Sequence, residues 1–147
     1  MRMLIFCSNF NCIIMPFVRI SLPKRFSKEV KNNVSLSVHH ALIEEFNIPQ
    51  DDFFHIIEEL DTDQIQYPEN YLGISHTSDI VYIQIIAGEG RTFDQKKRLY
   101  KSIADKIEHS TPITSNNVII VLLENNGLQN WSFGNGETQI PTHLKSE

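Results

Sequence analysis

The chain repeats one pattern of apolar residues, and this repetition restricts the possible folds more than any other feature. Equivalent residues recur at an interval of 63 positions (81 − 18 for one pair of valines). Three pairs share that interval: Val18 with Val81, Pro49 with Pro112, and Ile56 with Ile119. Two unrelated β-α-β units of similar length would give a related pattern. The shared interval favours an internal duplication instead.

The first repeat predicts a strand, a helix and a second strand. Apolar and polar residues alternate over residues 16–22, which is typical of a strand. Ser27 can cap the start of a helix, and Asn47 and Pro49 would end that helix. Residues 53–60 predict the second strand, so the first repeat forms a β-α-β unit.

The second repeat follows the same order. Residues 79–86 are rich in β-branched side chains and predict a strand. Thr92 and Gln95 fit a capping box at the start of a helix, which Pro112 would end. Residues 117–124 predict the last long strand. The buried face of the second helix should consist of Phe93, Leu99, Tyr100, Ile103, Ala104 and Ile107.

Together the two units predict an α/β fold. Each crossover should be right-handed with parallel strands, which gives a four-stranded sheet with two helices on one face. The other face would expose apolar side chains, and oligomerisation is the simplest way to cover them. Residues 61–78 predict a long loop between the repeats. Asn135 and Gly136 predict a short C-terminal hairpin.

Composition and charge argue against several classes of protein. The 147 residues are 41% hydrophobic, which suits a single globular domain. The net charge of −5 argues against nucleic acid or an anionic membrane as the main partner. No apolar run reaches the roughly 18 residues of a membrane helix. Both cysteines, Cys7 and Cys12, lie near the start and favour reduced thiols in a cytoplasmic protein, with metal binding as the alternative.

These features divide the chain into three parts. We expect one domain over residues 15–139. Residues 1–14 form an extension, either before a wrongly assigned start or without order. Residues 140–147 predict a flexible tail.

Several short motifs resemble the tautomerase superfamily, which includes 4-oxalocrotonate tautomerase and macrophage migration inhibitory factor. The branch near malonate semialdehyde decarboxylase is the most similar. The resemblance covers residues 15 to about 139. It rests on Met15-Pro16-Phe17-Val18, Ile48-Pro49 with Asp51-Asp52, Tyr71-Leu72-Gly73-Ile74, Gln84-Ile85, Gly90-Arg91-Thr92, Gln95-Lys96-Lys97 and the segment from Trp131 to Glu137. It implies a homotrimer with sites at subunit boundaries, an amino-terminal proline as the central catalytic group, and no cofactor.

Pro16 would be that catalytic group. The nitrogen of a terminal proline is a secondary amine whose neutral form can act as a general base beside a carbonyl. In the printed chain Pro16 is internal, and its nitrogen belongs to an amide. Translation from Met15, removal of the preceding residues, or loss of the activity would each account for this. We expect the mature chain to begin at Pro16. Taken alone, Pro16 would be only a proline tolerated at the first position of a strand.

The other candidate site residues follow from the same resemblance. Asp52 resembles the acidic residue that works beside the proline in decarboxylase and dehalogenase members, although aspartate is also common in turns. Arg91 resembles an arginine that holds the substrate carboxylate. The decarboxylase-like members carry two arginines in that turn, whereas this chain has one arginine and a nearby Glu89. Tyr71 and Trp131 are candidates for the walls of the site, with ordinary aromatic packing as the alternative.

The sequence thus predicts a cofactor-independent tautomerase for a small enol or 2-oxo carboxylic acid, with Pro16 as base. The alternatives are a decarboxylase for a 3-oxo acid such as malonate semialdehyde, or a hydratase or dehalogenase with the same site. A non-catalytic binding protein on the same fold is the third hypothesis. No group of histidines has the spacing of a metal site, and His55 is expected in the core or an interface.

Overall fold

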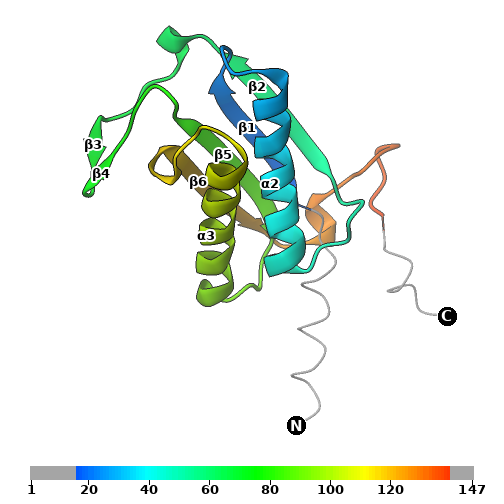
Figure 1. Cartoon of the computed structure of the whole chain (residues 1–147). Coiled ribbons are helices and arrows are strands. Elements are labelled where there is room, and N and C mark those ends of the chain that lie inside the picture. The colour runs from blue at the N-terminus through cyan, green and yellow to red at the C-terminus, as the bar shows by residue number, and fades with distance from the viewer. Residues whose placement is uncertain (1–15, 140–147) are drawn as a thin grey trace, which may run out of the picture.

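Two β-α-β units form one four-stranded sheet with both helices on the same face, as the sequence predicts (Figure 1). The computed structural model describes residues 16–139. The expectations for Cys7, Cys12 and the two terminal segments 1–14 and 140–147 lie outside these residues. The main elements are β1 (Phe17–Pro23), α2 (Lys28–Phe46), β2 (Phe54–Leu60), β5 (Val81–Gly88), α3 (Phe93–Ser110) and β6 (Val118–Asn125).

The parallel strand pairs have the same register in both units. The strands lie in the order β2-β1-β5-β6, with β1 parallel to β2 and β5 parallel to β6. Val18 pairs with His55, and Val81 pairs with Val118, so each pair is 37 residues apart (55 − 18 and 118 − 81). The equal spacing of the strand pairs in the two units agrees with an internal duplication.

The antiparallel contact between β1 and β5 lies at the centre of the sheet. Ile20 pairs with Ile83, its own equivalent 63 positions later (83 − 20). A strand pair in which equivalent residues face one another has an approximate twofold axis at that point. The two units are therefore related by rotation, and corresponding ends of β1 and β5 lie at opposite ends of the sheet.

The predicted helix caps are present. Ser27 Oγ accepts a hydrogen bond from the backbone N–H of Val30 at 3.2 Å, and Asn47 ends α2 in the left-handed conformation with φ 54°. At the start of α3, Gln95 N–H donates to Thr92 Oγ1 at 3.1 Å. Thr92 N–H donates in return to Gln95 Oε1 at 2.9 Å, which completes the capping box.

The core lies between the sheet and the two helices, and one predicted core residue is absent from it. Leu99, Ile103 and Ile107 are fully buried, but Phe93 is 71% exposed. Phe93 precedes Leu99 by six positions, which places it about a third of a turn around the helix from Leu99 and in the first turn of α3. Its ring lies beneath the ammonium group of Lys97 instead, at 4.9 Å. The prediction that Phe93 belongs to the buried face was wrong.

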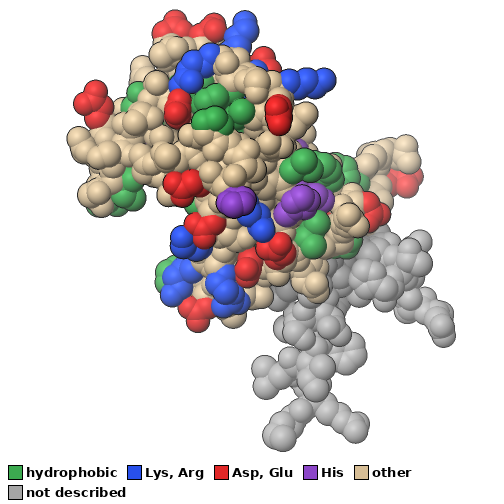
Figure 2. Space-filling model, viewed as in Figure 1, with side chains coloured by type: hydrophobic (Ala, Val, Ile, Leu, Met, Phe, Trp, Pro, Cys, Tyr) green, Lys and Arg blue, Asp and Glu red, His purple; other side chains and the backbone are tan. Residues whose placement is uncertain are grey.

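The face of the sheet opposite the helices remains uncovered within one protomer, as expected. Phe54, Ile56, Val121 and Leu123 project from β2 and β6 and are 39–50% exposed. On the helix face, acidic and basic side chains are interspersed (Figure 2). We refer to the uncovered side, defined by these four residues, as the bare sheet face.

The segment predicted as a long loop contains a small hairpin. Two short strands, β3 (Asn70–Tyr71) and β4 (Ile74–Ser75), pair in antiparallel fashion and project from the body of the molecule (Figure 1). Leu72 and Gly73 both have positive φ, 51° and 81°, as a type I′ turn requires. The loop prediction missed this hairpin, which we call the arm.

The C-terminal hairpin turn forms where it was predicted. Asn135 and Gly136 have φ of 60° and 68°, and Glu137 N–H donates to the carbonyl oxygen of Gly134 at 3.3 Å. Gln139 holds the two sides together, since its Oε1 accepts from the backbone N–H of Phe133 at 2.8 Å.

Candidate active site

One end of the sheet collects chain segments that are far apart in the sequence. Phe17, the first residue of β1, pairs with Phe54 at the start of β2 and with Ile86 near the end of β5. This meeting follows from the antiparallel orientation of β1 and β5. Pro16 and Asp52, which precede β1 and β2, are therefore carried to the same end of the sheet.

Pro16 is buried at this end, directly before the first residue of β1. β1 is an interior strand, with β2 on one side and β5 on the other. The start of the strand is consequently surrounded by protein, and a reactive group there would work in a largely desolvated place.

Asp52 is a buried carboxyl in the turn before β2, only 5% exposed. Its N–H donates to the carbonyl oxygen of Pro49 at 3.1 Å, and the N–H of Phe53 donates to the carbonyl of Asp51 at 2.9 Å. Burial raises the pKa of Asp52 above its usual range, and the neighbouring Asp51 carboxylate raises it further. Asp52 therefore holds a proton more readily than an exposed aspartate does.

Arg91 follows β5 and brings a positive charge to the same end of the sheet. It is 8% exposed, and its guanidinium donates to the carbonyl oxygens of Gly88 at 3.1 Å and Phe46 at 3.4 Å. The guanidinium carbon also lies 4.7 Å from the centre of the Phe46 ring. Glu89 in the same turn is exposed, while its backbone N–H donates to the carbonyl of Asn125 at 2.9 Å.

Three aromatic rings extend from the C-terminal segment to the start of β2. Trp131 is anchored by a hydrogen bond from its Nε1 to Asn125 Oδ1 at 3.1 Å. The rings of Trp131 and Phe133 are stacked with centroids 5.3 Å apart, and Phe133 lies 5.4 Å from Phe54. Trp131 was predicted from the sequence as a wall of the site, whereas its neighbours Phe133 and Phe54 were not. The Trp-x-Phe spacing in an extended segment was the available signal, because residues two apart share a face.

Comparison with known proteins decides the family. Two family models, each described as "Tautomerase enzyme", match residues 52–134 and residues 16–73. The probable tautomerase YusQ of Bacillus subtilis (strain 168) is 36% identical over 126 residues, which cover 86% of this chain and 98% of that relative. The chain belongs to the tautomerase family.

Solved structures agree with this assignment. A malonate semialdehyde decarboxylase inhibited by 3-bromopropiolate superimposes with a TM-score of 0.77 at 30% identity, covering 82% of this chain and 91% of the other. A fused 4-OT wild-type symmetric trimer has the same fold, with a TM-score of 0.68 at 14% identity over 83% of this chain and 94% of the other. The tautomerase thus lies near malonate semialdehyde decarboxylase within its superfamily, as the sequence motifs predict.

Tyr71, the remaining candidate, lies far from the others within the single chain. It belongs to the arm, which contacts the opposite end of the sheet, since Asn116 Nδ2 ahead of β6 donates to the carbonyl oxygen of Ser75 at 2.6 Å. Tyr71 is 59% exposed and lines a cavity of about 500 Å³ together with Tyr82 and Ile119. A role for Tyr71 in the Pro16 site would require a second copy of the chain.

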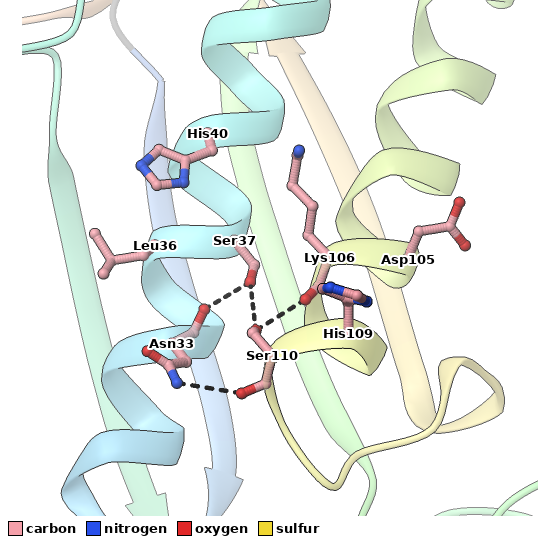
Figure 3. A pocket seen from close by; sticks show the side chains of 8 residues that line it. All are labelled: Asn33, Leu36, Ser37, His40, Asp105, Lys106, His109 and Ser110. Atoms are coloured by element: carbon pink, nitrogen blue, oxygen red, sulfur yellow. Dashed lines mark hydrogen bonds between the residues drawn. The ribbon is translucent and has the colours of Figure 1, made fainter.

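Another cavity of the tautomerase, of about 510 Å³, lies between the two helices, away from the sheet (Figure 3). Three of its polar side chains, those of Asn33, Ser37 and Ser110, link the two helices. Asn33 Nδ2 donates to the carbonyl oxygen of Ser110 at 3.2 Å, and Ser37 Oγ lies 3.2 Å from Ser110 Oγ. Lys106, on its rim, forms an ion pair with Glu44. These contacts join α2 to the end of α3, so the polar residues of this cavity have a structural role. The cavity is separate from the candidate site.

His55 faces the helix layer. Its Nδ1 lies 3.0 Å from Ser35 Oγ on α2, so this half-buried histidine packs against the helix layer. Burial and, to a smaller extent, the nearby His39 together lower the pKa of His55 to about 4.

Within residues 16–139, no three His, Cys, Asp or Glu side chains are grouped so that they could hold a metal ion. Neither helix in that range has the length and apolar character needed to cross a membrane.

Proposed function

We propose that this tautomerase is a cofactor-independent isomerase of a small enol or 2-oxo carboxylic acid, with Pro16 as the general base. The observation that carries the proposal is the location of three buried groups at the same end of the sheet. Pro16 begins the interior strand, Asp52 precedes its parallel neighbour, and Arg91 follows its antiparallel neighbour. A base, an acid and a cation at one place match the needs of proton transfer in a carboxylic acid.

The proposal requires that the mature chain begins at Pro16. An α-amino group titrates near pH 7.7–8.0, about where a general base is most effective, and burial favours its neutral form. Two observations support this start. One family model begins its match at residue 16, and the 126 residues matched to YusQ already account for 98% of that relative.

The proton transfer conserves all atoms. The neutral Pro16 amine accepts the proton of the enol hydroxyl, while the C–O bond becomes a carbonyl and the electron pair of the double bond moves to the neighbouring carbon. The resulting ammonium then returns its proton to that carbon, so the ketone leaves and the amine is regenerated. The positive charge of Arg91 would stabilise the substrate carboxylate and the negative charge that develops on oxygen.

Decarboxylation of a 3-oxo acid is the second candidate. Its support is the structural similarity to a malonate semialdehyde decarboxylase together with the buried Asp52. Asp52 could orient the leaving carboxylate, or activate water in a hydratase or dehalogenase reaction. A non-catalytic binding protein is the remaining hypothesis, and it would need no free amine at Pro16.

We further propose that the protein is a homotrimer in which copies cover one another's bare sheet face. Apolar side chains on that face are half exposed in a single protomer, and one structural neighbour is a symmetric trimer. The arm and the Pro16 site lie at opposite ends of the sheet. Contact between the arm of one copy and the site end of the next would be head-to-tail, and a head-to-tail contact can close into a ring of three.

Two preparations of the chain test the enzymatic proposal. One begins at Pro16, and the other retains residues 1–15 so that the Pro16 nitrogen stays in an amide. Only the first should convert the enol form of phenylpyruvate to the ketone, measured as loss of enol absorbance. Replacing the proline, Pro16→Ala, should lower the rate by about 100-fold because the amine changes in basicity and position. Equal activity of both preparations would refute Pro16 as base. Inactivity of both on a broad panel of enol and 3-oxo acids would favour the binding protein.

A further inference from the structure

His39 is a buried histidine of α2 that the proposed reaction does not use directly. It lies in the middle of the helix, is 4% exposed, and faces the turn that leads into β2. A buried polar ring calls for an account of its hydrogen bonds.

One ring nitrogen of His39 binds the backbone of that turn. Nε2 lies 2.8 Å from the carbonyl oxygen of Gln50. A carbonyl oxygen only accepts, so Nε2 carries the hydrogen and donates it. Nδ1 of the same ring is buried and has no hydrogen-bond partner within residues 16–139. The ring is therefore held in the tautomer with hydrogen on Nε2.

The face of the same ring holds the other end of the turn. His39 and Phe53 are stacked with ring centroids 4.2 Å apart and an angle of 12° between their planes. Gln50 and Phe53 are the residues on either side of the Asp51–Asp52 pair. A single side chain thus fixes both ends of the short segment that carries the buried carboxyl of Asp52.

The groups around this ring include few charges. His55 of β2 meets the His39 ring edge-on at 6.0 Å, and the next helix residue, His40, lies 6.3 Å away. Asp51 is exposed, whereas the carboxyl of Asp52 is buried. The interaction of His39 with the turn is therefore one of hydrogen bonding and ring stacking.

We propose that His39 is a positioning residue that holds Asp52 at the Pro16 end of the sheet, through its bond to Gln50 and its stacking on Phe53. The catalytic role of this positioning rests on the proposed function. Its structural content, that the donor on Nε2 keeps the Asp52 turn in place, can be measured without any substrate.

Two amide substitutions distinguish the role of Nε2 from that of Nδ1. In His39→Gln the side-chain nitrogen reaches about as far as Nε2 and can still donate to the Gln50 carbonyl. In His39→Asn the nitrogen takes the place of Nδ1 and does not reach that carbonyl. Both variants lose the stacked ring, so the difference between them reports the hydrogen bond. His40→Leu, on the neighbouring histidine, is the control.

The decisive measurement is an NMR titration of the Asp52 carboxyl in the full chain. In His39→Asn the loosened turn should expose Asp52, so that its pKa falls toward the ordinary value of about 3.9. Exchange of the Asp52 and Phe53 amide hydrogens should accelerate at least tenfold. His39→Gln should restore both properties toward those of the parent, and His40→Leu should leave them unchanged.

The outcomes distinguish this proposal from the proposed function. If the Asp52 titration is the same in the parent, His39→Asn and His39→Gln, the positioning role is refuted, even if the enzyme is active. If the titration shifts as expected but no acid is turned over, the positioning role stands and the proposed function fails. If His39→Asn does not fold, a folded His39→Gln with a normal Asp52 titration supports the role. A disturbed titration in that Gln variant refutes it.

Discussion

At the scale of single residues, Arg91 combines a binding role with a structural one. Its guanidinium is buried against two backbone carbonyls and the Phe46 ring. We expect Arg91→Ala to raise the KM for a carboxylic acid substrate and also to lower the free energy of unfolding by about 1–3 kcal/mol, because buried carbonyls lose donors. Urea unfolding and steady-state kinetics measure the two effects. Arg98→Ala, which removes an exposed partner of Glu45, should change stability by less than about 0.5 kcal/mol.

The buried Asp52 makes a distinct prediction for stability against pH. The pKa of Asp52 is raised in the folded protein. Its contribution to the free energy of unfolding is therefore fully present below the unfolded pKa, and it is lost as pH rises through the folded pKa. Asp52→Asn removes this loss. The variant should therefore gain stability relative to the parent as pH increases from about 4 toward neutrality. A stability difference that stays constant over this range in urea unfolding would contradict the prediction.

Asp52→Asn also separates the candidate reactions. If Asp52 only tunes the site, enol turnover continues in the variant with an altered pH profile. If Asp52 orients a leaving carboxylate or activates water, decarboxylase or hydratase activity disappears while enol turnover remains. Measuring both activities on one preparation distinguishes the two roles.

The pH dependence of stability expected from His55 has the opposite direction to that expected from Asp52. The pKa of His55 is lowered to about 4 in the folded protein. Its contribution to the free energy of unfolding is therefore present above the unfolded pKa of about 6.5 and is lost as pH falls toward 4. Over that range the parent should lose roughly 2–3 kcal/mol relative to His55→Asn, which cannot titrate but can still bond Ser35. Parallel unfolding curves of the two proteins from pH 7 to 4 would show that His55 is not buried as described.

At the scale of elements, the capping box of α3 is the clearest local stabilising feature. Thr92→Ala removes the oxygen that accepts from the Gln95 N–H and should lower the free energy of unfolding by about 1 kcal/mol. Ser102→Ala, in the middle of the same helix, should leave stability unchanged or raise it slightly, because alanine is the better helix former. Thermal or urea unfolding measures both. A loss for Ser102→Ala as large as that for Thr92→Ala would mean that the cap is not the cause.

At the scale of the whole molecule, the bare sheet face predicts the state of assembly. Val121 on that face and Leu36 on the helix face are similarly exposed, 50% and 41%. Val121→Asp should convert the proposed trimer into monomers, because a charge would be buried between copies. Leu36→Asp is the matched control and should remain trimeric. Light scattering gives the mass, about three times 17.0 kDa for a trimer of the full 147-residue chain. A parent protein that is monomeric at micromolar concentration would refute the trimer.

The sequence by itself determined the parts of the fold that depend on neighbours a few residues apart. Alternation identified the strands, and the caps at Ser27 and Thr92 follow from contacts three residues away. The interval of 63 positions identified the duplication. The motifs around Pro16, Asp52 and Arg91 named the family and its candidate site through resemblance.

Only the tertiary structure decided which of these residues lie at the same end of the sheet. Pro16, Asp52 and Arg91 share one end of the sheet because β1 and β5 pair in antiparallel fashion across the duplication. Tyr71 was carried to the opposite end, since the arm lies on the far side of the same pairing. His39 bonds Gln50 across a helix and a turn. Such contacts depend on strand pairing and helix rotation over tens of residues, and no local pattern in the chain records them.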